Sequence, residues 1–416
     1  MRVLFTATNW KGIYFCMVPL GWALQAAGHE VRVACSRDQA DTIARAGLVP
    51  APVLHGFELM QVERMSRYAA AVRDPDGFAA APPVHPVTGQ PVAHYGEYDV
   101  DAHREEFSRR YDETMGRNCD AAVALARAWH PDLVVHDLMT PEGVLAAETT
   151  GIPYVYHSPG LFGSMEAGLH DPTGAFPRHG VHGWDRSRIA YAIDPSPDLM
   201  APDLGSALRL PVRYVPYNGP GAMEPWLLER PARPRVCLLW GNSASGIFGT
   251  DLPALRHAVD AVVGAGAELV LTAAPDQVAA LGELPDGVRL LSDQPLHLLL
   301  EHCDAVIHQG SVNPMMTALS LPQLVLALTD DQIEIGRRFA AGGSAILLPG
   351  LTATARDVRT AVARLLTDGS LKEAAAVVKA DADAHPSVAE TVPALERLAR
   401  TGELSAADLP ARALQP

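Results

Sequence analysis

Short apolar runs alternate with longer amphipathic stretches along most of this chain. The first apolar run covers residues 2–7, a turn follows at 8–12, apolar positions with helical spacing cover 15–27, and a second apolar run covers 30–34. Short apolar runs predict buried strands, and apolar positions three or four residues apart predict helices. Gly28 follows the first predicted helix, where glycine commonly ends helices. Strand, helix and strand in this order predict the start of a Rossmann-like domain.

The same alternation continues through the first half of the chain. Residues 121–129 and 143–150 have helical spacing, and residues 132–135 and 154–156 are apolar strand candidates. Successive strands joined by helices predict a parallel sheet buried on both faces. The first half is therefore expected to form one α/β domain.

A proline-rich stretch separates the two halves of the sequence. The prolines between Val215 and Arg235 are Pro216, Pro220, Pro225, Pro231 and Pro234. Composition of this kind is typical of a linker between domains. After it the strand and helix patterns restart, which predicts a second doubly wound α/β domain facing the first across a cleft. The predicted parts are an N-terminal domain at 1–218, a linker at 219–234, a C-terminal domain at 235–385, and a C-terminal helix and tail at 386–416.

One segment of the N-terminal half departs from the alternation. Residues 75–91 are rich in proline, glycine and histidine, and residues 97–117 are rich in charge. The simplest interpretation of 75–117 is an excursion over the surface of the N-terminal domain. The functional alternative is a lid or a partner-docking segment, because long loops of compact domains often serve one of these roles.

The stretch at 303–332 carries the strongest prediction of a binding site. It reads as a strand at 305–308, a turn, a short helix, and a second strand at 323–328. Parallel sheets bind ligands beyond the carboxyl ends of their strands, and the loops at 308–314 and 329–332 both leave such ends. The helix N-terminus after the first loop favours an anion such as a phosphate. Carboxylate and amide groups in the second loop can accept hydrogen bonds from hydroxyls, so together the loops predict a nucleotide-sugar site.

Composition and charge narrow the classes of partner. The chain has 416 residues and a formal net charge of −15. Nucleic acids and anionic membrane surfaces attract clustered cations, so neither partner is expected. No run of 18 apolar residues is present, and the apolar run at the N-terminus is too short for a signal peptide, so we expect a cytoplasmic protein. The cysteines are odd in number and form no CxxC, which predicts reduced thiols and no metal site; they are Cys16, Cys35, Cys119, Cys237 and Cys303.

Several ordered segments resemble one known family. The chain is similar to the GT-B glycosyltransferases of actinobacterial antibiotic pathways, especially those that attach TDP-deoxysugars to macrolides and aromatic polyketides. The resemblance implies an inverting transfer from a TDP-sugar to a small-molecule acceptor, with no metal or other cofactor. It also implies a homodimer or an auxiliary cytochrome-like partner protein. The segments that carry it are residues 18–34, 131–137, 192–200, 212–220, 235–243 and 331–332.

The resemblance assigns acceptor-side residues, with one departure. The position where the family usually has its catalytic histidine is Ile13, which cannot take a proton. The partner carboxylate of the family corresponds to Asp137, which the resemblance implies as the catalytic residue; the alternative is a helix N-cap. The acceptor-side candidates are Ile13, Tyr14, His136 and His157, the two histidines as replacement bases by position alone. Packing is the alternative for Tyr14, and a surface or core histidine is the alternative for His136 and His157.

The donor loop also departs from the family pattern, which is close to His-His-Gly-Gly-x-Gly-Ser. Gln309 replaces the second histidine, and Pro314 removes a backbone N–H near the helix end. Asn313 is expected to cap the helix, and His308 could instead be a structural histidine. The resemblance assigns donor binding in this loop to His308, Gln309, Gly310, Ser311 and Asn313.

Four further residues complete the predicted donor site. Asp331 and Gln332 correspond to the pair that contacts sugar hydroxyls in the family, although Asp331 could simply cap the following helix. Ser243 corresponds to a position near the phosphates. Gln294 lies where the family holds the nucleotide base.

Two functions follow from these residues. The first is a glycosyltransferase that acts on a polyketide-type acceptor, for which a phenol or a carbon nucleophile suits a site with Ile13 in place of a base, because phenols ionise near pH 10. The second is a related scaffold that has lost donor chemistry and serves as a repurposed biosynthetic enzyme or a non-catalytic auxiliary.

Overall fold

The computed structural model describes residues 1–78, 83–163, 169–171, 173–229, 231–292 and 294–410. The chain divides into two compact units, each assembled from separate parts of the sequence. Unit 1 consists of Met1–Phe57, Phe107–Pro220 and Ala380–Pro416. Unit 2 consists of Glu58–Glu106 and Gly221–Lys379.

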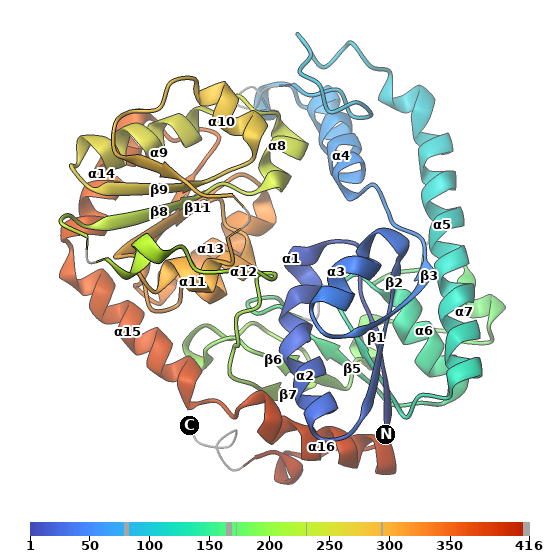
Figure 1. Ribbon diagram of the computed structural model, residues 1–416. Coiled ribbons are helices and arrows are strands. Elements are labelled where there is room, and N and C mark those ends of the chain that lie inside the picture. The colour runs from blue at the N-terminus through green and yellow to red at the C-terminus, as the bar shows by residue number, and fades with distance from the viewer. Residues whose placement is uncertain (79–82, 164–168, 172, 230, 293, 411–416) are drawn as a thin grey trace. The chain divides into compact units, whose positions relative to one another are not determined.

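Unit 1 is built on a seven-stranded sheet in the order β3-β2-β1-β4-β5-β6-β7, and every neighbouring pair is parallel (Figure 1). The strand order reverses beside β1, which is the position where open α/β sheets bind ligands. The strands are β1 (Arg2–Thr6), β2 (Glu30–Ser36), β3 (Val49–Leu54), β4 (Leu133–His136), β5 (Tyr154–His157), β6 (Tyr191–Asp194) and β7 (Leu208–Pro211).

Helices cover both faces of this sheet because its strands are apolar on both sides. One core combines strand residues with α2 and α16, and a second combines them with α5 and α6. The helix predicted at 15–27 begins later, since Phe15–Met17 forms a 3₁₀ turn before Pro19 enters the first turn of α2. The helices are α1 (Lys11–Tyr14), α2 (Val18–Ala26), α3 (Ala40–Arg45), α5 (Val100–Trp129), α6 (Pro141–Thr150), α7 (Ala175–Arg178) and α16 (Val388–Thr401). The first residues of α5, up to Glu106, belong to unit 2.

Unit 2 contains a six-stranded parallel sheet in the order β10-β9-β8-β11-β12-β13 (Figure 1). The strands are β8 (Arg235–Leu239), β9 (Glu268–Thr272), β10 (Val288–Leu290), β11 (Ala305–His308), β12 (Gln323–Ala327) and β13 (Ala345–Pro349). The helices are α4 (Leu59–Arg73), α8 (Asn242–Phe248), α9 (Pro253–Gly264), α10 (Pro275–Leu281), α11 (Leu296–Leu300), α12 (Val312–Thr317), α13 (Asp330–Ala341), α14 (Ala355–Thr367) and α15 (Gly369–Ala384), the last of which continues into unit 1.

The strand and helix alternation predicted for both halves is confirmed, and the fold class is α/β with two Rossmann-like sheets. Among the described residues, none of the helices combines the length and the apolar character needed to cross a bilayer.

The compact units differ from the predicted domain boundaries at residues 58–106. We predicted these residues as part of the N-terminal domain, but the structure groups them with unit 2. Helix α4 packs on α8, where the Arg67 guanidinium lies 4.3 Å from the centroid of the Phe248 ring. The Arg64 guanidinium also donates a hydrogen bond to the Gly246 carbonyl oxygen. Local sequence patterns carry no information about such contacts between distant segments.

The predicted C-terminal helix and tail at 386–416 belong to unit 1. Leu395 and Leu398 of α16 are fully buried against α2 and the strand core. His29 also bonds to Glu396 of α16 at 2.9 Å. The last helix of the chain therefore completes the core of the N-terminal sheet.

We predict that Leu395→Ala destabilises unit 1 by about 2–5 kcal/mol, because truncating a buried leucine leaves a cavity. A thermal unfolding scan should show a lower transition temperature for this variant. Arg400→Ala is the matched control on the exposed face of the same helix, and it should change stability by less than about 0.5 kcal/mol. Equal transition temperatures for the two variants would contradict this packing.

Candidate active site

The two predicted donor loops lie side by side at the carboxyl edge of the unit 2 sheet. They follow β11 and β12, which are parallel neighbours with His308 opposite Val325. Gly310 has φ 101°, and a Cβ built there would lie 3.1 Å from the Gln332 Cβ. Glycine at 310 therefore allows both the left-handed backbone and the close contact between the loops.

His308 is fully buried at the end of β11, and both of its ring nitrogens have partners. Nδ1 accepts a hydrogen bond from the Gly310 N–H at 3.0 Å, and Nε2 donates to the Gln323 Oε1 at 2.9 Å. The Gln323 amide donates in turn to the carbonyl oxygens of Met315 and Ala318 at 3.1 and 2.9 Å. Burial lowers the pKa of His308 to about 4, so the ring is neutral at pH 7. These contacts favour the structural alternative for His308.

Gln309 joins the loop after β11 to the loop after β8. Its buried side chain accepts a hydrogen bond from the Gly241 N–H at 3.0 Å. A Cβ at Gly241 would lie 2.6 Å from the Gln309 amide nitrogen, so the two loops are in close contact. Ser243 lies in the first turn of α8, directly after this contact, and is half-buried. Ser243 thus follows, by two residues, the glycine that contacts the predicted donor loop.

The cap of helix α12 differs from the prediction. Ser311 is the N-cap residue, with an extended backbone, and α12 starts at Val312. Asn313 is therefore the second residue of the helix rather than its cap. Its carbonyl oxygen accepts a hydrogen bond from the Thr317 hydroxyl at 2.7 Å. Pro314 follows as the third residue, where helical N–H groups have no intrahelical partner and proline is tolerated.

Asp331 and Gln332 lie in the first turn of α13, whose N-cap is Thr329. The Gln332 Oε1 accepts a hydrogen bond from the Leu328 N–H at 2.9 Å, which holds the loop against its own helix. Asp331 is exposed and accepts a hydrogen bond from the Thr329 hydroxyl. Its remaining acceptor capacity is available to hydroxyl groups, because a carboxylate has about four lone-pair sites.

Gln294 precedes α11, next to the carboxyl edge of the same sheet. Its Oε1 is buried and has no hydrogen-bond partner among the described residues. A buried acceptor without a partner is uncommon in proteins. The preceding residue, Asp293, lies outside the described residues.

On the acceptor side, Asp137 is fully buried in the loop after β4 of unit 1. Its carboxylate accepts hydrogen bonds from the Thr8 N–H at 2.7 Å and the Met139 N–H at 2.8 Å. Burial raises the pKa of Asp137 to about 6, although these hydrogen bonds oppose the shift. The carboxylate thus connects the loop after β1 to the loop after β4. Asp137 is not the N-cap of the following helix, because the N-cap of α6 is Thr140. The geometry favours a structural role for Asp137 within the protein.

Ile13 and Tyr14, which follow the first turn of unit 1, pack in different apolar clusters. Ile13 is partly buried and packs against the apolar cluster that contains Leu138 and Tyr156. Tyr14 is buried, and its hydroxyl donates a hydrogen bond to the Gln39 Oε1 at 2.9 Å. The structure therefore favours core packing over the acceptor-side role that we predicted for Tyr14.

His136 and His157 are buried at the ends of β4 and β5. The Nδ1 of His136 donates to the Asp137 carbonyl oxygen at 2.9 Å, and the Nδ1 of His157 donates to the Ser158 carbonyl oxygen at 3.0 Å. Burial lowers the pKa of each imidazole to about 4. Burial keeps both rings from a ligand at the surface, so core packing is the favoured interpretation.

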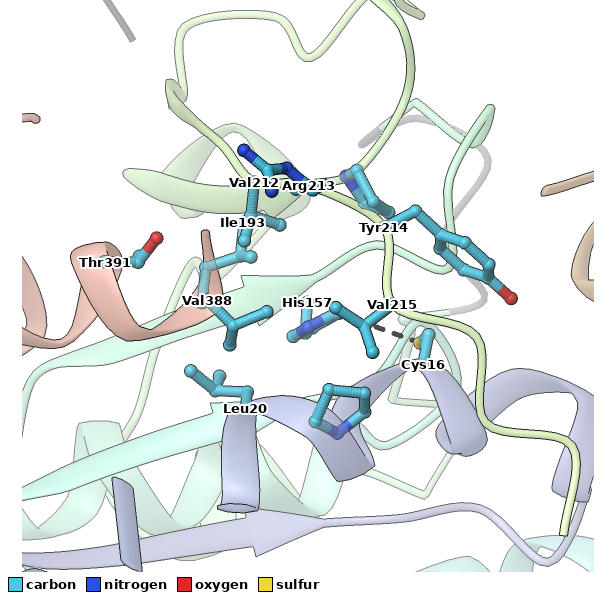
Figure 2. A pocket seen from close by; sticks show the side chains of 12 residues that line it. Cys16, Leu20, His157, Ile193, Val212, Arg213, Tyr214, Val215, Val388 and Thr391 are labelled. Carbon is cyan, nitrogen blue, oxygen red and sulfur yellow. Dashed lines mark hydrogen bonds between the residues drawn. The ribbon is translucent and has the colours of Figure 1, made fainter. Parts of the chain in front are cut away.

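A small cavity lies beside His157 (Figure 2). Its volume is about 10 Å³, which suits one water molecule and no larger ligand. The Cys16 Sγ lies 3.7 Å from the His157 Nδ1 at one end of it. Burial raises the pKa of the Cys16 thiol far above its usual range, so this pair contains a neutral thiol and a neutral imidazole. The remaining lining includes Leu20, Val212 and Val388.

Sequence reasoning missed Gln323, which positions both His308 and α12. Its only signal is a polar residue at the start of an apolar strand, and its partners are separated from it in sequence. It also missed Glu142, a buried carboxyl whose pKa burial raises to about 8.

Comparison with known proteins identifies relatives over nearly the whole chain. Residues 22–241 match the family model of the erythromycin biosynthesis protein CIII-like N-terminal domain, and residues 256–398 match that of its C-terminal domain. The chain is 34% identical to 10-deoxymethynolide desosaminyltransferase of Streptomyces venezuelae, over 96% of this chain and 97% of the relative. It is 33% identical to aklavinone 7-beta-L-rhodosaminyltransferase of Streptomyces galilaeus, over 96% of each chain.

A solved structure extends this similarity to three dimensions. The glycosyltransferase VinC, crystallised in complex with DTDP, superposes with a TM-score of 0.74 at 32% identity, and the match covers 96% of this chain and 100% of VinC.

We predict that Gly310→Ala destabilises the protein by about 1–3 kcal/mol, because an alanine is strained at this backbone angle and its Cβ would press on Gln332. Thermal unfolding followed by circular dichroism measures the change. The control is Gly264→Ala at the end of α9, where a Cβ meets nothing within 4 Å and φ is not positive. The control should leave stability unchanged or raise it by about 0.5–1 kcal/mol. A neutral Gly310→Ala would contradict the close contact between the two loops.

Proposed function

The chain belongs to the erythromycin biosynthesis protein CIII-like family and is a GT-B glycosyltransferase, and on this premise we propose that it moves a deoxysugar from a TDP-sugar to a polyketide-type acceptor. The names of the relatives support the sugar and acceptor classes, since they specify desosaminyl transfer to 10-deoxymethynolide and rhodosaminyl transfer at aklavinone. The observation that carries the proposal is the contact between Gly310, in the loop before α12, and Gln332, in the first turn of α13. The exposed Asp331 lies in the same turn of α13.

On the donor side we propose two kinds of contact. The N-terminal end of α12, capped by Ser311, favours the diphosphate because helix N-termini carry a partial positive charge. Asp331 accepts hydrogen bonds from sugar hydroxyls. Gln294 offers its buried Oε1, which has no hydrogen-bond partner among the described residues, to the N–H group of the thymine base. In this arrangement His308 and Gln309 stabilise the loop through their hydrogen bonds within the protein and make few contacts with the donor.

On the acceptor side we propose that the attacking group of the acceptor is itself acidic enough to lose its proton without a strong base from the protein. Ile13 cannot take a proton. Asp137 is buried, and its carboxylate accepts hydrogen bonds from two backbone N–H groups. His136 and His157 are buried, and burial lowers their pKa values. A phenol or a carbon acid needs less help from a base than an aliphatic alcohol does. The family resemblance further supports an inverting outcome, which stays a prediction.

Two partner proposals also rest on the resemblance: a homodimer and an auxiliary cytochrome-like protein. We place the auxiliary contact on the predicted 75–117 segment. Within it, residues 101–106 at the start of α5 are exposed and mostly charged. This surface is compatible with a partner that binds through ion pairs.

We predict that wild-type protein releases TDP when TDP-desosamine or TDP-rhodosamine is incubated with 10-deoxymethynolide, aklavinone and simple phenolic aglycones. Asp331→Asn should lower kcat/KM by about ten- to hundredfold, because hydrogen bonds to a charged group contribute about 1.5–3 kcal/mol. Asp330→Asn makes the same charge change one residue earlier and should stay within about twofold of wild type. Chromatography of released TDP measures both. No release from any donor, with no TDP binding, would instead favour the scaffold without donor chemistry.

The pH profile separates acceptor ionisation from a protein base. If Asp137 were the base, kcat/KM would fall below about pH 6, its pKa, and would be flat above it. We predict instead that kcat/KM for a phenolic acceptor keeps rising above pH 7 toward the phenol pKa, near 10 for an unsubstituted phenol. Substituted phenols of lower pKa should move the rise to lower pH. A profile that is flat above pH 6 for every acceptor would support Asp137 as the base.

A further inference from the structure

The turn after β5 holds a strained leucine beside the apolar cluster that contains Ile13. Gly160 has φ 100° and Leu161 has φ 62°, so two successive residues adopt left-handed backbone angles. Glycine tolerates this region, whereas leucine adopts it only when the surrounding structure holds it there. Leu161 is fully buried. Non-glycine residues held in such conformations cluster at functional sites.

Ser196 is one of the groups that hold this turn. The Leu161 N–H donates a hydrogen bond to the Ser196 Oγ at 2.7 Å. The Ser196 hydroxyl donates in turn to the Asp194 Oδ1 at 2.5 Å. Ser196 and Asp194 are both fully buried, so no water competes for these bonds. The hydroxyl therefore has defined donor and acceptor roles.

The ion pair of Arg209 and Asp194 fixes the carboxylate to which the Ser196 hydroxyl donates. The Nε of Arg209, on β7, lies 2.8 Å from the Asp194 Oδ2, and the same guanidinium donates to the Ser196 carbonyl oxygen. The guanidinium also pairs with Asp198. The backbone of the 194–198 loop is thus fixed on two strands of the sheet, and a displacement of Leu161 would have to break a buried hydrogen bond.

The residue after the strained pair packs on the same apolar cluster as Ile13. Phe162 packs against the cluster of Leu138 and Tyr156, the same cluster that Ile13 contacts. The Ser158 hydroxyl donates to the Phe162 carbonyl oxygen at 3.3 Å and accepts from the Gly160 N–H at 3.1 Å. The path of the turn therefore determines where Phe162 lies relative to Ile13.

We propose that Ser196 is a positioning residue for the acceptor: its hydroxyl clamps Leu161 so that Phe162 and Ile13 form one apolar wall for a polyketide-type aglycone. This inference rests on the proposed function. Ser196 touches neither substrate nor a reacting group, and it acts through the backbone of the turn. Loss of the clamp weakens acceptor binding and leaves the donor site in unit 2 unchanged.

The test compares Ser196→Ala and Ser196→Cys with Ser187→Ala, an exposed serine of the same unit whose hydroxyl bonds only locally, to Asp185. The acceptor in these kinetic measurements is aklavinone or 10-deoxymethynolide, whichever the wild-type protein glycosylates faster. Ser196→Ala should raise the acceptor KM about tenfold, the factor that corresponds to about 1.4 kcal/mol. Its kcat and its Kd for TDP should stay within about twofold of wild type. Ser196→Cys should fall between, because a thiol is a weak acceptor, and Ser187→Ala should match wild type.

An unchanged acceptor KM in Ser196→Ala would overturn the inference, as would a parallel loss of TDP affinity, which indicates a general loss of structure. Turnover by wild type distinguishes these failures from failure of the proposed function. If wild type turns over neither acceptor, hydrogen–deuterium exchange of the 158–163 peptide still tests the clamp. Exchange should be faster in Ser196→Ala than in wild type, and equal exchange would overturn the clamp.

Discussion

The loop after β11 and the helix α12 that follows it are held by the buried hydrogen bonds of His308 and Gln323. Both residues lie in strands that are otherwise apolar, and both are fully buried. A buried polar group without a partner costs about 1–3 kcal/mol, so each must be paired. The available partners are the Gly310 N–H and the last carbonyl oxygens of α12. Satisfying these polar groups therefore fixes the path of the loop and the position of the helix together.

The same constraint shapes the carboxyl edge of the unit 1 sheet. Asp137 is paired with backbone N–H groups of two loops, and Ser196 is paired with the Leu161 N–H. These side chains are occupied within the protein, so they shape the site without being free to bind. In the function proposed above, the exposed Asp331 and the N-terminus of α12 are the donor-side groups of unit 2, and the apolar surface around Ile13 is the acceptor-side surface of unit 1. An apolar acceptor wall and a polar donor edge suit the transfer of a sugar to an aglycone.

The sequence was enough to predict both sheets, because buried parallel strands produce apolar runs that are readable locally. The strand at 305–308 has the predicted bounds, and both donor loops follow the strands from which we predicted them. The roles of individual polar residues were not readable, because they depend on partners far away in sequence. His308 and Asp137 fitted either a ligand or a structural role until their neighbours were known. The grouping of 58–106 with unit 2 depends on contacts of α4 with α8, which no local pattern contains.

We propose that the carboxyl edge of the unit 2 sheet is a working nucleotide-sugar site, although Gln309 and Pro314 depart from the family pattern. Calorimetric titration of the protein with TDP tests this most directly, with UDP and inorganic phosphate as comparisons. We expect saturable binding of one TDP per chain, weaker binding of UDP, and no measurable binding of phosphate alone. If the folded protein bound no TDP, this edge of the sheet would not be a nucleotide-sugar site.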